Sequence, residues 1–171
     1  YLDVISRIFE WLNDEMIDQG GGFYSSMDAD SEGVEGKYYV WKQSEIGDIL
    51  ANEDADIFNQ YFDITEEGNW EGNSIPHIIM KKLSLSNLLK ISEDKIIRSL
   101  ECSRLKVKEH RNTRIPPGTD DKVIVSWNAL MISSLAKVSY ALGKEEYFDV
   151  ADKAVAFITE KMSKKDGTLK R

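Results

Sequence analysis

The residues best suited to chemistry lie in an acidic stretch near the N-terminus. Residues 21–41 read GGFYSSMDADSEGVEGKYYVW, and the aromatic pair in this stretch is followed by four carboxylates: Asp28, Asp30, Glu32 and Glu35. Paired carboxylates can act as general acid and base, as enzymes that act on sugars often require. A solvated acidic turn would have the same composition, and the sequence does not fix the separation of the carboxylates. From this stretch we take Asp28 and Asp30 as candidate catalytic residues and Tyr24 and Glu35 as candidate ligand-binding residues.

Calcium binding is an alternative for this stretch, because DADSEG matches the opening of an EF-hand loop. Asp28, Asp30, Glu32 and Gly33 would take positions 1, 3, 5 and 6, but Tyr39 stands at position 12, where a bidentate Glu belongs. The flanking residues also favour strands over helices. With two histidines and one cysteine, the chain is poor in other metal ligands. We therefore predict no metal and no cofactor.

A second polar stretch, GNWEGNSIPH at residues 68–77, surrounds Trp70 and Glu71 with two glycines and two asparagines. This composition is typical of a fixed irregular loop. An exposed Trp can stack on the face of a sugar while neighbouring polar groups bind its hydroxyls. The structural alternative is a Trp that packs the loop onto the core. We include Trp70 and Glu71 among the predicted ligand-binding residues.

A third stretch, RIPPGTDDKVIVSWNALM at residues 114–131, places two carboxylates where a helix is expected to begin. Helix capping would explain one of Asp120 and Asp121, but hardly both. Asn128 is costly to bury without partners, so it either holds a loop carbonyl or faces a cavity. This stretch adds the candidate catalytic residues Asp120 and Asp121 and the candidate ligand-binding residues Lys122, Trp127 and Asn128.

Composition restricts the class of partner. The net charge of −8 argues against nucleic acid, because phosphate binding needs clustered Lys and Arg. No apolar run approaches the ~18 residues that a membrane span requires, so we predict no membrane partner and a cytoplasmic location. At 171 residues the chain is long enough for one domain with a real core.

Hydrophobic periodicity predicts a mainly helical domain that covers residues 1–171. The predicted segments are a helix at 1–20, short helices and loops at 42–91, a helix at 92–112 that Ser92 caps, and an αα-hairpin at 122–162. Ser44 is the expected cap of a short helix that ends near Leu50. Within 21–41, residues 23–26 and 37–41 are expected to form an antiparallel β pair with the acidic loop between them.

The final hairpin has an inner and an outer member. Residues 122–142 are apolar on nearly every side, which predicts burial on most faces, and Gly143 ends this helix. The next helix, about 144–162, is amphipathic and carries Tyr147, Ala151 and Ala154 on its apolar stripe. A buried helix joined to a half-exposed one by a tight turn is how each unit of a helical toroid is built.

The three polar stretches, in this order and spacing, resemble the YyaL-like family of thioredoxin-domain-containing proteins, whose eukaryotic branch is described as spermatogenesis-associated and thioredoxin-like. The resemblance covers essentially the whole chain. It implies an N-terminal thioredoxin-like domain followed by an (α/α)6 toroid similar to six-hairpin glycosidases and N-acylglucosamine 2-epimerases. This chain would hold only a middle part of that toroid, and its partners would include the other toroid parts and the thioredoxin-like domain.

Two functional hypotheses follow. In the first, the intact protein epimerises, isomerises or hydrolyses a sugar, and this chain supplies part of the pocket for a carbohydrate-like molecule; the chain alone would be inactive. In the second, the toroid is a non-catalytic scaffold or partner-binding module attached to a redox domain. The first predicts a carboxylate with a raised pKa, and the second predicts carboxylates that face water or pair with Lys and Arg. Exposed apolar faces, especially on 122–142, would favour self-association.

Overall fold

A computed structural model describes residues 1–170 of the chain, which are mainly helical and divide into two compact units. Unit 1 combines Tyr1–Asp28 with the segment from Thr119 onward, and unit 2 is Ala29–Gly118. Each unit has its own hydrophobic core. The sequence predicts a single domain, whereas the structure has two compact units. In the sequence, unit 2 is inserted between the two segments of unit 1.

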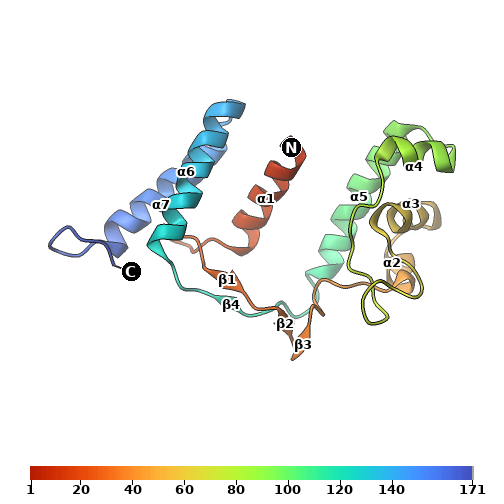
Figure 1. Cartoon of the computed structure of the whole chain (residues 1–171), viewed down its shortest axis with the longest axis horizontal. Coiled ribbons are helices and arrows are strands. Elements are labelled where there is room, and N and C mark those ends of the chain that lie inside the picture. The colour runs from red at the N-terminus through yellow and green to blue at the C-terminus, as the bar shows by residue number, and fades with distance from the viewer. Residues whose placement is uncertain (171) are drawn as a thin grey trace. The chain divides into compact units, whose positions relative to one another are not determined.

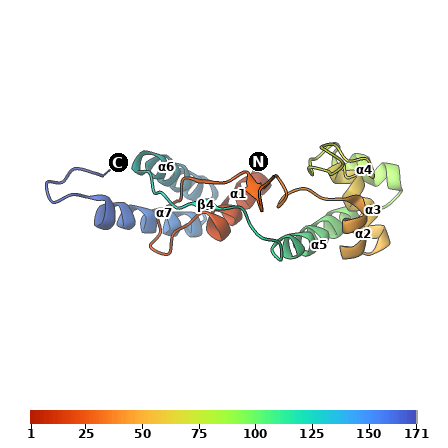
Figure 2. The same ribbon diagram turned by 90° about the horizontal axis from the view of Figure 1, so that it is seen from below.

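Unit 1 contains three α-helices: α1 (Leu2–Glu15), α6 (Val125–Leu142) and α7 (Glu145–Phe157), the last extended by a π-helical turn, η1 (Ile158–Met162). α6 and α7 pack side by side as the predicted αα-hairpin (Figures 1 and 2). Gly143 ends α6 with a φ of 64°, a conformation in which a side chain would be strained. The core of the unit is formed by Leu12, Met16, Phe23, Leu135, Tyr147, Ala151 and Ala154.

The three glycines at 20–22 are explained by the close approach of this loop to α7. A Cβ at Gly22 would lie 2.8 Å from the Phe157 ring, and one at Gly20 would lie 2.9 Å from the same ring. Gly21 has a φ of +103° and would clash with Lys153. The loop can therefore cover Phe157 only where side chains are absent.

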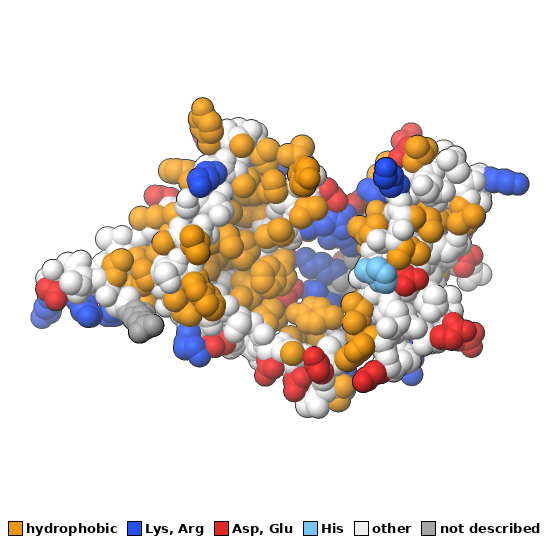
Figure 3. Space-filling model, viewed as in Figure 1, with side chains coloured by type: hydrophobic (Ala, Val, Ile, Leu, Met, Phe, Trp, Pro, Cys, Tyr) orange, Lys and Arg blue, Asp and Glu red, His pale blue; other side chains and the backbone are white. Residues whose placement is uncertain are grey.

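α6 is less buried than its sequence predicts. Of its residues only Asn128 and Leu135 are buried, whereas Leu130 is 70% exposed and Tyr140 is 92% exposed. The expectation of burial on most faces is wrong for this structure, because α1 and α7 together cover only part of an all-apolar helix. Figure 3 shows many hydrophobic side chains on the surface of this unit.

Unit 2 contains four helices: α2 (Gln43–Ile49), α3 (Asn52–Phe62), α4 (Lys82–Leu89) and α5 (Glu93–Arg111). Their core is built around Trp41, Ile46, Ile57, Leu85 and Ile96. The predicted cap at Ser92 is confirmed, since its side chain accepts a hydrogen bond from the Lys95 N–H. The cap predicted at Ser44 is wrong, because α2 begins at Gln43 and its N-cap is Lys42, two residues before Ser44.

The small antiparallel β structure exists, but its pairing differs from the expectation. Residues 23–26 and 37–41 do not pair with each other within the described chain. Instead β1 (Ser26–Met27) pairs with β4 (Thr119–Asp120), and β2 (Asp30–Ser31) pairs with β3 (Val34–Glu35). Trp41 forms an isolated bridge with Ser74. The acidic loop is therefore itself a tight hairpin, which the alternation of apolar residues did not reveal because each strand has only two residues.

A candidate ligand pocket between two tight turns

Two tight turns of unit 2 share one sequence feature, a Glu-Gly pair. Glu32 and Gly33 join β2 to β3 with φ values of 54° and 75°, and Glu71 and Gly72 have φ values of 48° and 73°. Positive φ at both central residues is what a type I′ turn requires. Around the second turn Trp70 and Asn73 form a β-bridge. Neither turn was predicted from the sequence, because a Glu-Gly pair indicates a type I′ turn less strongly than Asn-Gly or Asp-Gly does.

The second turn is held in place by close backbone packing. A Cβ at Gly68, where φ is +72°, would lie 2.2 Å from the Asn73 carbonyl oxygen. The Asn69 amide accepts a hydrogen bond from the Ile75 N–H at 2.8 Å and donates to the Ile75 carbonyl at 3.1 Å. Trp70 is half-buried, and its ring would lie 3.2 Å from a Cβ at Gly36. The loop thus presents Trp70 in a fixed position, with one part of its ring against the backbone of residue 36.

Arg114 fixes the segment that follows the first turn. Its Nη1 donates to the Tyr38 and Val40 carbonyls at 3.0 and 2.9 Å, and its Nη2 donates to Glu45 Oε1 at 2.6 Å. The guanidinium also lies 3.9 Å from the centre of the Trp41 ring. An arginine suits this position because its planar group can form hydrogen bonds in several directions and stack on an aromatic ring at the same time.

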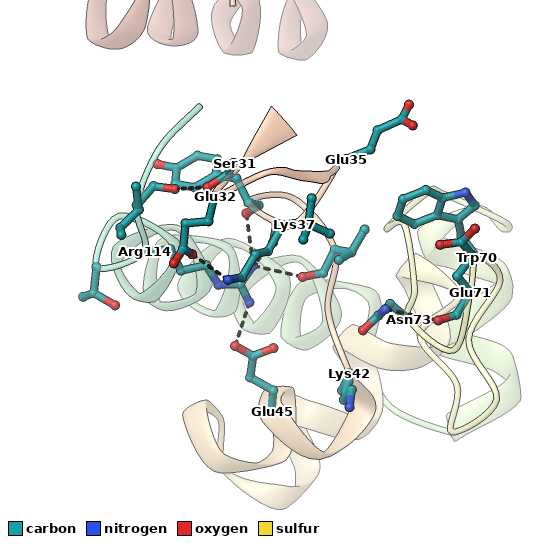
Figure 4. Close-up of a pocket in the computed structure, with 15 residues that line it drawn as sticks. Ser31, Glu32, Glu35, Lys37, Lys42, Glu45, Trp70, Glu71, Asn73 and Arg114 are labelled. Atoms are coloured by element: carbon teal, nitrogen blue, oxygen red, sulfur yellow. Dashed lines mark hydrogen bonds and ion pairs between the residues drawn. The ribbon is translucent and has the colours of Figure 1, made fainter. Parts of the chain in front are cut away.

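A pocket of about 490 Å³ lies among these elements, and we call it the hairpin pocket. Its wall includes residues from both turns, from the segment after β3, from α2 and from the segment after α5: Ser31, Glu32, Glu35, Lys37, Lys42, Glu45, Trp70, Glu71, Asn73 and Arg114. Figure 4 shows Trp70 and Glu71 on one rim and Arg114 across from them. Of the predicted site residues, Glu35, Trp70 and Glu71 line this pocket.

Several acidic groups of the hairpin pocket are already paired. Glu32 forms an ion pair with Lys37 at 2.6 Å, and Glu45 forms one with Arg114. Within residues 1–170, Glu35, Glu71 and Lys42 form no ion pair. These three groups, with the Trp70 ring and the Asn73 amide, are available to a ligand. A polar small molecule with an apolar face fits this combination.

In unit 1, Asp120 stands opposite Ser26 in the β1–β4 ladder. Lys122 binds the Asp120 carboxylate at 2.6 Å, and its backbone N–H also points to this group. The hydrogen bond from Lys122 lowers the pKa of Asp120, although partial burial opposes the shift. A general acid needs a raised pKa, so this environment favours an Asp120 that is ionised and paired near neutral pH.

Tyr24 is half-buried on the same unit, and its hydroxyl lies 3.5 Å from Asp18 Oδ2. Partial burial raises the pKa of Tyr24, and the negative charges of Asp18 and Asp121 raise it further. Tyr24 therefore stays protonated near neutral pH and can serve as a hydrogen-bond donor. Asp121 is exposed, as is Asp28.

Asn128 holds a loop backbone, which was the first of its two expected roles. Its Oδ1 accepts a hydrogen bond from the Phe23 N–H at 2.7 Å, and its Nδ2 donates to the carbonyls of Phe23 and Ile124 at 3.0 Å each. The residue is 1% exposed, so both amide hydrogens are used inside the unit. Trp127, one residue earlier, is 55% exposed on α6.

The structure thus divides the predicted site residues between the two units. Unit 1 holds Tyr24, Asp28, Asp120, Asp121, Lys122, Trp127 and Asn128, and unit 2 holds Asp30, Glu35, Trp70 and Glu71. The convergence of Asp28 or Asp30 with Asp120 or Asp121 stays a prediction. Arg114 and Lys42 were missed by sequence analysis. For Arg114 the adjacent Pro-Pro-Gly marked a loop, but nothing local indicated contacts more than 70 residues away.

Two negative findings apply to the described part of the chain. Residues 1–170 contain no group of three or more His, Cys, Asp or Glu side chains arranged to hold a metal ion. No helix among them combines the length and the apolar character needed to cross a membrane.

Comparison with curated proteins identifies relatives. The chain is 31% identical over 179 residues to the uncharacterized protein B0495.5 of Caenorhabditis elegans, covering 91% of the chain and 24% of that protein. It is 28% identical to spermatogenesis-associated protein 20 of Mus musculus over 197 residues, and of Homo sapiens over 187 residues. These two matches cover 100% and 95% of the chain, but 25% and 24% of the relatives.

The chain therefore spans about a quarter of the length of these relatives. No protein-family model matches it. The matches nevertheless extend along essentially the whole chain. They support a relationship to the family that includes spermatogenesis-associated protein 20, as the three polar stretches suggested.

Proposed function

We propose that unit 2 binds a small carbohydrate-like molecule in the hairpin pocket. The observation that carries this proposal is the fixed position of Trp70 beside Glu35, Glu71 and Asn73 on the wall of a 490 Å³ pocket. The indole ring offers a surface for the apolar face of a sugar, and the carboxylates and the amide can accept or donate hydrogen bonds to hydroxyls. Lys42 adds a donor.

The proposal assigns binding, and no catalytic step, to this chain alone. The pairing of Glu32 with Lys37, of Glu45 with Arg114 and of Asp120 with Lys122 is what a non-catalytic module predicts, and the pKa of Asp120 is lowered, not raised. In the intact protein, the resemblance implies a toroid in which further segments would complete the wall of a cavity. An epimerase, isomerase or glycosidase-like activity would belong to that complete toroid.

A second candidate function is that of a scaffold attached to a thioredoxin-like redox domain. The exposed apolar side chains of α1 and α6 favour it, among them Val4, Ile8, Trp127 and Leu130. In this proposal the other parts of the toroid cover these side chains in the intact protein, and the chain alone self-associates through them.

The test uses the indole N–H signals of the chain, which contains four tryptophans. In proton–nitrogen correlation spectra, titration with glucose, mannose and N-acetylglucosamine should shift the Trp70 signal, assigned with Trp70→Phe. Trp70→Ala should weaken the binding of the responsive sugar by about tenfold, because it removes the stacking surface. Trp127→Ala, which changes an exposed indole of unit 1, is the matched control and should not affect binding.

The outcomes separate the two candidates. A saturable shift of the Trp70 signal supports the sugar-binding proposal if Trp70→Ala, followed through its backbone amide signals, also binds the same sugar about tenfold more weakly. If no sugar shifts that signal, or if Trp70→Ala binds as tightly as the unchanged chain, the hairpin pocket is not a sugar site. Concentration-dependent sedimentation without any sugar response would then favour the scaffold.

A further inference from the structure

We propose that a second pocket of unit 2 binds the ammonium group of a small aliphatic amine. This pocket, which we call the α3 pocket, has a volume of about 340 Å³ and lies along the C-terminal half of α3. Its polar wall includes Asp56, Asn59 and Asp63, and its apolar wall is formed by Ile64, Ile79 and Met80. It shares no lining residue with the hairpin pocket, so the inference is independent of the proposed function.

The charges around the α3 pocket favour a cation. Asp56 and Asp63 both line it, and its described lining includes no Lys or Arg. Asp63 is also the C-cap of α3, where the negative end of the helix dipole adds to the attraction for positive charge. The imidazole of His77 lies beside this carboxylate, with Nε2 at 3.5 Å from Asp63 Oδ2.

One polar atom at this pocket lacks a hydrogen-bond partner. Asn59 is only 8% exposed, and its Oδ1 is buried without a donor. Burying an amide oxygen in this way is unfavourable, and because Asn59 also lines the pocket, a rotation of its amide toward a ligand N–H would supply the missing donor. An ammonium group carries three N–H donors, enough for this oxygen and for carboxylates of the same pocket.

The size and the apolar wall favour an organic cation over a bare metal ion. A metal needs several oxygen ligands within about 2.6 Å, and residues 1–170 contain no group of three or more acidic, His or Cys side chains arranged for this. Ile64, Ile79 and Met80 would instead contact methylene groups. A short alkyl chain ending in an ammonium group matches both walls.

The experiment titrates the chain with 1,4-diaminobutane at pH 8 and records backbone amide shifts. We expect a saturable response confined to the end of α3 and to residues 79–80. The same titration with 1-butanol, which has a similar carbon chain but no charge, should give no such response. Calcium chloride at equal concentration should also leave these signals unchanged.

Three variants of equal charge change complete the test. Asp56→Asn and Asp63→Asn should each weaken diaminobutane binding by about tenfold, since each removes a charged acceptor. Asn is well tolerated at residue 63, where φ is 54°. Asp48→Asn, on an exposed position of α2 outside the pocket, is the control and should leave the affinity unchanged.

The proposal is overturned by any of four results: no saturable shift, an equal response to 1-butanol, tighter binding of calcium at the same signals, or an equal loss with Asp48→Asn. An equal loss with Asp48→Asn would show that diaminobutane binds only through the net negative charge of the chain. Failure of the sugar titration leaves this test unaffected, because the two pockets share no lining residue.

Discussion

At the residue scale, Arg114 has the largest structural role of any side chain around the hairpin pocket. It joins the backbone of residues 38–40 to Glu45 of α2 and stacks on the buried Trp41. Its side chain is 19% exposed, so these hydrogen bonds are only weakly screened by solvent. Pocket shape therefore depends on a residue that need not contact the ligand.

Arg114→Lys should lower the free energy of unfolding by about 3 kcal/mol, because an ammonium cannot reproduce the planar set of hydrogen bonds or the stacking. Urea unfolding followed by circular dichroism measures this change. Arg98→Lys, at an exposed position of α5, is the control and should stay within about 0.5 kcal/mol of the unchanged chain. Equal stability of the two variants would contradict the role given to Arg114.

Asp120 allows a prediction about pH. Lys122 holds the pKa of Asp120 below its ordinary value of 3.8, so the pairing stabilises the fold at higher pH and is lost as pH falls through that lowered pKa. Lys122→Met should raise the pKa of Asp120, which carboxyl-carbon NMR titration measures directly. Lys137→Met, an exposed position of α6, removes the same charge elsewhere and should leave the titration unchanged. An unshifted titration in Lys122→Met would disprove the pairing.

At the element scale, the turns of unit 2 depend on backbone conformations that few residues adopt. Glu32 and Glu71 have positive φ, which costs a non-glycine residue about 1–2 kcal/mol each. Such strain persists only where surrounding contacts determine the conformation, and both turns line the hairpin pocket. Both turns therefore contribute directly to the shape of its wall.

Gly68→Ala should destabilise unit 2 by at least about 2 kcal/mol, since a Cβ there would overlap the Asn73 carbonyl and φ is positive. Thermal unfolding and the position of the Trp70 indole signal would both report the change. Gly47→Ala is the matched control. Gly47 lies in α2 with open space around it, and because alanine forms helices better than glycine, this substitution should stabilise the chain by up to about 1 kcal/mol. We therefore expect the free energy of unfolding to fall in Gly68→Ala and to rise in Gly47→Ala.

At the scale of the whole molecule, the two units each have a separate core. The buried residues of unit 2 form one cluster on α2–α5 and the preceding segment, and those of unit 1 form another on α1, α6 and α7. Unit 2 is also continuous in sequence, from Ala29 to Gly118. A continuous segment with its own core is expected to fold alone.

Residues 29–118 expressed alone should therefore give a folded protein. We expect dispersed amide spectra whose shifts match those of the same residues in the whole chain, and cooperative unfolding in urea. Poorly dispersed spectra would show that unit 2 needs unit 1 to fold. If the exposed side chains of α6 cause self-association, sedimentation should show that the whole chain self-associates and that residues 29–118 stay monomeric.

Features that depend on local interactions could be predicted from the sequence. Helix periodicity located the main helices, although α1 ends at Glu15 and not at residue 20. The Ser92 cap and the Gly143 stop were correct, because each depends on residues within a turn or two of one another. The three polar stretches also pointed to the family of spermatogenesis-associated protein 20, and three of the predicted ligand-binding residues line the hairpin pocket.

Features that depend on distant residues became visible in the folded structure and not before. It paired Ser26 with Asp120, used Asn128 to hold Phe23 at a separation of 105 residues, and placed Arg114 on the segment around Val40. It also left α6 exposed although its composition predicts burial, because burial depends on how many helices pack around it. Local sequence carries no record of these partners, so their positions follow from packing alone.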